Sequence, residues 1–468
     1  MARRKTKIIS TLGPATQSPE MIHQLITAGA NVFRLNMSHA SHDWCREVIG
    51  QIKEQSYATG VSVASLIDLQ GPSIRTGDID GKMNLKKGDT VEFRNASLEP
   101  KSPISVTTNY DGLHEDVSVG DVMLVDNGEI HFRVHHIDEG RLTCEVLTDG
   151  QMGSRRHINL PGIRVNLPAL TKKDLMDIEV AAELQVDYVA ISFVRDAEHV
   201  CLLREKLDEL DSSARIVSKI EDQEAVKHLS EIIKESDAVM VARGDLGIEV
   251  HIEELPVIQR AIVKESARIG RKVIVATHML ESMTENPVPT RAEVTDVANA
   301  IFEQADAVML SGETSVGQYP IKCIEVLDRI ARRMEREPGA GFSEDIELRT
   351  EKQHTVKSAV GLANSLEDAH LIIFTARGVL ANYAAHQRPT RANIYAFSPD
   401  EVVVRALNLN RAVFSYPMQF NKDPEKSIRH AIDLLREKGQ IEPGDSVVIL
   451  SDVLNQDFDT EAILLRKA

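Results

Sequence analysis

Two neighbouring apolar segments in the middle of the chain each end in charged residues. Ile216–Val217 is followed by Lys219 and Glu221, and Ala238–Val241 is followed by Asp245. Apolar residues recur at near-helical spacing between them, which predicts a strand, a helix and a second parallel strand. Parallel sheets carry functional groups at the carboxyl ends of their strands. One lysine and two carboxylates there could hold a divalent metal and an anionic substrate, and solvated charge at strand ends is the alternative.

Eight short apolar runs of this kind alternate with helical stretches. They are Lys7–Leu12, Val32–Met37, Val61–Asp68, Val186–Phe193, Ile216–Lys219, Ala238–Ala242, Val273–Thr277 and Ala307–Leu310. Eight alternating strands and helices predict a (β/α)8 TIM barrel. Polar residues occur at the carboxyl end of nearly every run, and a purely structural barrel gives no reason for that pattern. The pattern therefore indicates an active site at this end of the barrel.

The interval between Asp68 and Val186 is several times longer than the others. Glycines divide it into short strand-like runs, namely Thr90–Phe93, Val122–Val125, Ile130–Val134 and Leu142–Val146. Turn residues at this density predict a small all-β domain, a β-barrel, inserted after the third barrel strand. Its position over the strand ends would make it a lid. The barrel resumes near Pro168, and Thr171 is expected to cap the next helix.

A segment rich in Glu, Gly and Pro, residues 335–345, predicts the next boundary. Beyond it, apolar runs again alternate with helical stretches, at Leu371–Thr375, Ile394–Phe397, Ala412–Tyr416 and Val447–Ser451. These runs predict a separate α/β sheet domain. The expected organisation is a catalytic barrel of residues 1–70 and 168–338, a lid of residues 71–167 and a C-terminal domain of residues 339–468.

Charge and composition narrow the classes of function. The chain has 468 residues, too many for one core, with 71 acidic and 54 basic side chains and a net charge of −17. This balance argues against a general binder of nucleic acid or acidic membranes, and it still permits a local basic pocket. The four cysteines are far apart, and no signal-peptide or transmembrane run is recognised. A cytoplasmic protein with reduced thiols is expected.

Eight segments carry a more specific signal. They are Lys5–Pro14, Asn31–His39, Asp68–Arg75, Ser218–Glu221, Met240–Gly247, Ala276–Met283, Pro289–Glu293 and Asp306–Thr314. In this order they resemble the motifs of pyruvate kinase, and the resemblance covers essentially the whole chain. It implies transfer of a phosphoryl group from phosphoenolpyruvate to ADP, the last step of glycolysis. It also implies a homotetramer.

The resemblance assigns roles to the charged residues. Glu221 and Asp245 would bind Mg²⁺, which prefers hard oxygen ligands. Lys219 would stabilise charge on the phosphoryl oxygens and on the developing enolate. Arg34 would hold the phosphoryl group with its planar guanidinium. These residues are the expected centre of catalysis.

Further residues would bind the rest of the two substrates. The backbone amides of Gly244 and Asp245 would bind the substrate carboxylate, and Thr277 would act in protonation of the enolate. Nucleotide-binding residues would be Asn36, Arg75 and Arg156, the last standing where the family usually has a lysine. His278 replaces a glutamine common in the family, and its role stays open.

A monovalent cation is less strongly indicated. The positions that match the family's K⁺ ligands are Asn36, Ser38, Asp68 and the carbonyl of Leu69. Members that need K⁺ typically read Asp-Thr-Lys-Gly-Pro-Glu, and those that do not read Asp-Leu-Gln-Gly-Pro-Lys. This chain has Leu69 and Gln70 like the second group, whereas Ser73 matches neither. We predict appreciable activity without K⁺.

One loop of the C-terminal domain predicts whether sugar phosphates activate the enzyme. Many family members bind a sugar phosphate on a loop after the first main strand of this domain, through hydroxyls and backbone amides. The corresponding loop keeps Thr375 and Gly378 but has Arg377 and Leu380 where small hydroxyl residues would be expected. We predict weak or absent activation by fructose 1,6-bisphosphate or similar sugar phosphates.

Two other functions fit parts of the pattern. A Mg²⁺-dependent lyase acting on a 2-oxo acid enolate would also suit the barrel, although Arg75, Arg156 and the lid favour an enzyme that holds a nucleotide. A catalytically inactive metabolite sensor is the second alternative. It is weakened because the lysine, both carboxylates and the threonine are all present.

Overall fold

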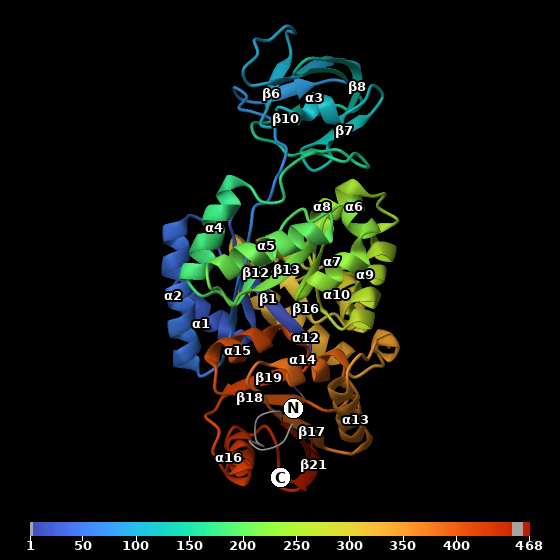
Figure 1. Cartoon of the computed structure of the whole chain (residues 1–468). Coiled ribbons are helices and arrows are strands. Elements are labelled where there is room, and N and C mark those ends of the chain that lie inside the picture. The colour runs from blue at the N-terminus through green and yellow to red at the C-terminus, as the bar shows by residue number, and fades with distance from the viewer. Residues whose placement is uncertain (1–2, 452–461) are drawn as a thin grey trace.

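Eight parallel strands close into a barrel at the centre of the molecule (Figure 1). The computed structural model describes residues 3–451 and 462–468. The barrel strands are β1 Lys7–Thr11, β2 Val32–Asn36, β3 Ala64–Asp68, β12 Tyr188–Ile191, β13 Arg215–Ile220, β14 Ala238–Ala242, β15 Lys272–Ala276 and β16 Ala307–Leu310. Their order around the barrel is β1-β16-β15-β14-β13-β12-β3-β2. Each of the eight predicted runs overlaps one of these strands, so the predicted barrel is confirmed.

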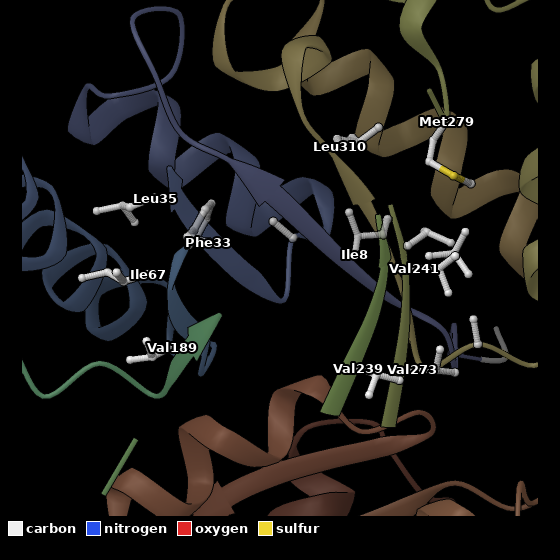
Figure 2. Packing of buried hydrophobic residues seen from close by; sticks show 14 of the residues in the cluster. Ile8, Phe33, Leu35, Ile67, Val189, Val239, Val241, Val273, Met279 and Leu310 are labelled. Atoms are coloured by element: carbon white, nitrogen blue, oxygen red, sulfur yellow. The ribbon is translucent and has the colours of Figure 1, made fainter. Parts of the chain in front are cut away.

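Alternating side chains of the barrel strands fill two separate cores. Outward-facing residues such as Ile8, Phe33 and Val239 pack beneath the surrounding helices (Figure 2). Inward-facing residues such as Ile9 and Met240 fill the barrel itself. Successive residues of a strand point to opposite faces, which explains why neighbours in the chain enter different cores. Both faces are buried, so these strands read as continuous apolar runs in the sequence.

Helices surround the barrel and connect its strands. They are α1 Pro19–Ala28, α2 His42–Thr59, α4 Lys172–Glu183, α5 Ala197–Glu209, α6 Gln223–Lys227, α7 Leu229–Glu235, α8 Arg243–Glu249, α9 Leu255–Ile269, η1 Glu281–Thr284, α10 Arg291–Phe302, α11 Gly312–Ser315 and α12 Pro320–Met334. Thr171 caps α4 as predicted, because its side chain accepts the amide of Asp174 while the Asp174 carboxylate accepts the amide of Thr171. Asp174 also accepts the amide of Gly71, so α4 is tied to the segment that enters the lid.

The inserted segment forms a separate all-β domain above the carboxyl ends of the barrel strands (Figure 1). Its elements are β4 Met83–Leu85, β5 Thr90–Asn95, β6 Ser105–Thr108, the short helix α3 Leu113–Asp116, β7 Val122–Val125, β8 Ile130–Asp138, β9 Arg141–Val146, β10 Gly150–Met152 and β11 Ile158–Asn159. They make a six-stranded sheet, β11-β7-β8-β9-β5-β6, and a two-stranded sheet, β10-β4. Phe93 and Phe132 meet edge to face in its core, with ring centroids 5.0 Å apart. The lid thus has a hydrophobic core of its own.

The C-terminal domain is an α/β sheet at the opposite end of the barrel (Figure 1). Its elements are η2 Phe342–Asp345, α13 Glu351–Ser365, β17 Ala369–Phe374, α14 Val379–His386, β18 Ile394–Ser398, α15 Glu401–Ala406, η3 Leu407–Leu409, β19 Val413–Pro417, α16 Pro424–Glu437, β20 Ser446–Ser451 and β21 Ala462–Lys467. The sheet order is β19-β18-β17-β20-β21. The four predicted runs overlap the four parallel strands, whereas β21, an antiparallel edge strand, was not predicted.

The C-terminal domain docks on the barrel through buried apolar and ionic contacts. Ala406 and Leu409 belong to the cluster that fills the barrel. Both guanidinium nitrogens Nη1 and Nη2 of Arg388 donate to the Asp306 carboxylate at 2.6 Å, and both side chains are buried. Burial alone would raise the pKa of Asp306, but the Arg388 charge outweighs it and the pKa is lowered. This bidentate pair is a main polar connection between the two domains.

A hydrogen bond within the loop between β17 and α14 holds the start of the helix. Thr375 is buried, and its Oγ1 accepts the amide of Gly378 at 3.1 Å. Gly378 has a φ of 78°, in the left-handed region that favours glycine, and Leu380 is buried. The loop therefore packs against the domain as a helix start.

Candidate active site

Lys219, in β13, contacts two buried carboxylates. Its Nζ lies 2.8 Å from Glu221 Oε1 and 3.4 Å from Asp68 Oδ1, and it donates to Ser192 Oγ at 2.7 Å. Burial disfavours the ammonium, but the charges of Asp68 and Glu221 outweigh it and raise the pKa of Lys219. Lys219 is therefore a fixed positive charge at neutral pH.

Arg34 supplies a second positive charge on the other side of Asp68. Its Nε donates to Asp68 Oδ2 at 2.7 Å, and its Nη1 donates to Thr11 Oγ1 at 3.2 Å. Asp68 is buried, which would raise its pKa, but Lys219 and Arg34 together lower it. Arg34 also lines a hollow between β1, β2 and α11. Two cations held by one carboxylate make a site suited to phosphoryl oxygens.

Glu221 has the properties of a metal ligand. Its side chain is 1% exposed, and its Oε2 accepts the amide of Phe193 at 2.7 Å. Its Oε1 lies 2.8 Å from Lys219 Nζ, in the ion pair described above. Burial raises the pKa of Glu221 to about 7, while Lys219 opposes this shift and Asp245 adds to it. A buried carboxylate that lies near a second carboxylate, that of Asp245, fits a hard divalent cation.

Asp245 is the second carboxylate, on the first turn of α8 and partly exposed. Across residues 3–451 and 462–468, no group of three or more His, Cys, Asp or Glu side chains is placed to hold a metal. Two protein carboxylates suit Mg²⁺, since Mg²⁺ usually keeps several waters and substrate oxygens as its other ligands. The residues present therefore fit Mg²⁺.

Thr277 follows β15 in an unusual backbone conformation. Its φ is +67°, and the next residue, His278, has a φ of +55°. Positive φ is rare for a β-branched residue, and it is found where surrounding contacts hold the backbone. Arg243 supplies such contacts, because its Nε donates to the Thr277 carbonyl at 3.2 Å while its Nη1 donates to Asp296 at 2.7 Å. The Thr277 hydroxyl accepts the amide of Gly244 at 3.2 Å.

Neither His278 nor Glu313 has the contacts expected of a residue that takes part directly in catalysis. His278 is exposed, with its Nε2 3.5 Å from a carboxylate oxygen of Glu281. The Glu313 carboxylate accepts the amides of Leu280 at 3.1 Å and Ser311 at 2.7 Å. Glu313 therefore joins the loops after β15 and β16.

The two candidate nucleotide-binding arginines lie at the base of the lid. Arg75 donates from Nε to Ser73 Oγ at 3.2 Å and pairs with His157 in a short antiparallel bridge. Arg156 is partly exposed, with its Nη1 3.3 Å from Asp126 Oδ1. Both guanidinium groups contact other lid residues.

The four candidate K⁺ ligands come from neighbouring segments, and oxygens of Asn36, Asp68 and Leu69 already have partners. Asn36 Oδ1 accepts the amide of Ser38 at 3.1 Å, and Ser38 is exposed. The Leu69 carbonyl accepts the Ser192 hydroxyl at 2.8 Å. Asp68 is neutralised by Lys219 and Arg34, as described above. This arrangement gives little drive to bind a further cation.

The structure thus brings the predicted catalytic residues to one end of the barrel, and it gives contacts to two strand-end residues for which the sequence suggested no role. Ser192 holds Lys219, and Arg243 holds the backbone at Thr277. Ser192 and Arg243 both stand at predicted strand ends, which was the available signal. Their partners come from other strands, so the sequence alone did not show what they contact.

Comparison with known proteins bears on the whole chain. Family models described as "Pyruvate kinase, barrel domain" and "Pyruvate kinase, alpha/beta domain" match residues 3–324 and 353–463. The chain is 38% identical over 453 residues to plastidial pyruvate kinase 2 of Arabidopsis thaliana, covering 96% of this chain and 78% of that protein. It is 39% identical over 461 residues to pyruvate kinase of Geobacillus stearothermophilus, with the same coverage. A crystal structure of a pyruvate kinase from Cryptosporidium parvum matches with a TM-score of 0.93 and 32% identity, over 99% of this chain and 96% of that one.

Proposed function

The chain belongs to the pyruvate kinase family of phosphotransferases, and we propose that it transfers the phosphoryl group of phosphoenolpyruvate to ADP at the cluster around Lys219. One observation carries this placement. Lys219 and Arg34 both contact Asp68 at the carboxyl ends of barrel strands, and Lys219 also pairs with the buried carboxylate of Glu221. The arrangement offers two positive charges and a metal ligand around one point, which phosphoryl transfer needs.

Glu221 and Asp245 would hold Mg²⁺, which when bound neutralises charge on the substrate oxygens. Lys219 is buried and stays charged, so its ammonium can stabilise the transferring phosphoryl group and the enolate oxygen without reorganisation. Arg34 would orient the phosphoryl oxygens from the other side. The bond between phosphorus and the enol oxygen breaks, and a bond to a β-phosphate oxygen of ADP forms.

The enolate left behind must gain a proton on carbon to become pyruvate. Thr277 would act in this step, and its hydroxyl and backbone are held by Gly244 and Arg243. The backbone amides of Gly244 and Asp245, at the start of α8, would bind the substrate carboxylate. The Gly244 amide now donates to the Thr277 hydroxyl, so substrate binding would exchange that partner and release the hydroxyl.

ADP would lie between the barrel and the lid. Asn36 would contact it from β2, and Arg75 and Arg156 would contact its phosphates from the lid. Both arginines have weak, partly exposed partners that a phosphate can replace. A lid closed over the strand ends would also exclude water from the transferring group.

The finer features of the enzyme are proposals of the same kind. We propose Mg²⁺ as the divalent metal, a homotetramer in the cytoplasm, and domain boundaries after residues 70, 167 and 338. The family model of the barrel domain ends at residue 324, and the model of the alpha/beta domain begins at residue 353. These limits support the last boundary. Within the part of the chain that the structure describes, no helix is long and apolar enough to cross a membrane. Similar enzymes include a chloroplastic isozyme of Nicotiana tabacum, so the compartment needs its own measurement.

The test is pyruvate formation from phosphoenolpyruvate, ADP and Mg²⁺, followed by coupling to lactate dehydrogenase. We expect activity that requires both ADP and Mg²⁺. Asp245→Asn should reduce turnover severely and raise the Mg²⁺ requirement, whereas Asp43→Asn, on the exposed surface of α2, should not. Consumption of phosphoenolpyruvate without ADP would contradict the proposal and favour a lyase.

A further inference from the structure

The lid touches the barrel at both ends of helix α8. Near its start, the Nδ1 atom of His157 lies 3.8 Å from Asp245 Oδ1, an electrostatic contact longer than a hydrogen bond. At its end, the Nδ2 atom of Asn159 donates to Glu249 Oε1 at 3.0 Å. His157 and Asn159 come from the lid, and Asp245 and Glu249 come from the barrel.

The spacings of strand and helix explain why two contacts form together. Residues two apart on a strand lie on one face, about 6.6 Å from each other. Residues four apart on a helix also lie on one face, about 6 Å from each other. Ile158, between the two lid residues, points the other way into the lid core. His157 and Asn159 are therefore directed together towards α8 and match the spacing of Asp245 and Glu249.

His157 also lies against the loop that positions Glu221. Its ring meets the ring of Phe193 edge to face, with centroids 5.8 Å apart. The Phe193 amide donates to Glu221 Oε2, and Phe193 has a φ of +55°, so its backbone is held in an uncommon conformation. His157 thus lies beside Asp245, and it is linked to Glu221 through Phe193.

We propose that His157 and Asn159 are positioning residues that seat the lid on α8 and, through His157, fix the orientation of Asp245 and of the Phe193 loop. The inference rests on the proposed function in one respect, that Asp245 and Glu221 bind the metal. Seating of the lid then assembles the metal site, because the same contact that holds the lid orients the carboxylate. Groups that orient metal ligands usually change metal affinity by about 10-fold to 100-fold when they are removed.

The experiment uses the full chain and four variants. His157→Ala removes the contact with Asp245, and His157→Asn keeps a polar nitrogen close to the position of Nδ1. Asn159→Ala removes the contact with Glu249. His136→Ala is the matched control, since His136 is an exposed histidine on the lid strand β8.

Two readouts are independent of turnover. Mn²⁺ binding without substrates, measured by electron paramagnetic resonance, reports the metal site. Amide hydrogen exchange in residues 71–76 and 157–165 reports how firmly the lid is seated. We expect His157→Ala to weaken Mn²⁺ binding by about 10-fold and to speed exchange, with partial recovery in His157→Asn. Asn159→Ala should speed exchange in the same segments, and His136→Ala should behave as the unaltered chain.

Unchanged Mn²⁺ affinity in His157→Ala would overturn the proposal, even with faster exchange, because the link to Asp245 is what it claims. Unchanged amide hydrogen exchange in Asn159→Ala would overturn the claim that the contact with Glu249 seats the lid on α8. Failure of the proposed function has a different signature. It would appear as an unaltered chain that makes no pyruvate from phosphoenolpyruvate and ADP, whatever the lid variants do.

Discussion

Replacing Lys219 by methionine removes the central positive charge while keeping a side chain of similar length. The ammonium now lies 2.8 Å from a Glu221 oxygen and 3.4 Å from an Asp68 oxygen, and Arg34 still contacts Asp68 in the variant. Glu221 is left buried without its cation. Removing one preorganised electrostatic group lowers kcat by about 10²–10³-fold, which corresponds to about 2.7–4 kcal/mol of transition-state stabilisation.

Replacing Lys219 by methionine should also raise the pKa of Glu221. The Lys219 charge lowers the pKa of Glu221, which burial has already raised to about 7. Without Lys219 this pKa rises further, so Glu221 carries a proton over more of the neutral range and binds Mg²⁺ less well. Raising the pH from about 6.5 to about 8.5 increases the ionised fraction of Glu221. Higher pH should therefore lower the half-saturating Mg²⁺ concentration towards that of the unaltered chain, while kcat stays low.

The assay measures kcat and the half-saturating Mg²⁺ concentration at both pH values with saturating phosphoenolpyruvate and ADP. Lys227→Met is the matched control, because Lys227 is exposed and pairs only with Glu224 among the residues that the structure describes. Near-normal turnover of Lys219→Met at saturating Mg²⁺ would refute the reasoning. So would a kcat that recovers fully at high pH.

Three further outcomes are expected. Activity should persist without K⁺ or NH₄⁺, since Leu69 and Gln70 match the members that do not need K⁺, and an enzyme silent without K⁺ would contradict this. Fructose 1,6-bisphosphate should change the half-saturating phosphoenolpyruvate concentration little, because Thr375 is buried; a several-fold fall abolished by Thr375→Ala would refute this. Arg388→Met should destabilise the fold by about 3–5 kcal/mol, unlike the exposed Arg391→Met. The lowered pKa of Asp306 adds stability above its unfolded pKa of about 3.9, lost as pH falls through the folded pKa. Equal thermal melting of both arginine variants would disprove the Arg388 prediction.

The barrel could be predicted because its strands are buried on both faces. Ala238–Ala242, for example, is apolar throughout and ends at charged residues, which is a strong signal in a sequence. β21 was missed because it is an antiparallel edge strand that pairs with β20 and leaves most of its side chains exposed. Its strand character depends on the partner rather than on its own pattern.

The sequence predicted which charged residues form the centre of the site, but it did not predict which of them contact one another. Lys219, Glu221 and Asp245 stand at strand ends in the sequence, and parallel strands bring such ends together. The sequence did not show that Asp68 joins Lys219 and Arg34, because these residues meet only when the barrel closes. Contacts across domains, such as Arg388 with Asp306, have no local pattern at all.

The most direct test of the account is the number of divalent metal ions that the chain binds and the residues on which binding depends. Mn²⁺ titration followed by electron paramagnetic resonance, in the presence of phosphoenolpyruvate, measures this without turnover. The account predicts one tightly bound Mn²⁺ per chain, with binding weakened severely in both Glu221→Gln and Asp245→Asn. Mn²⁺ bound equally well by either variant would contradict the claim that these two carboxylates, at the ends of β13 and β14, form the metal site.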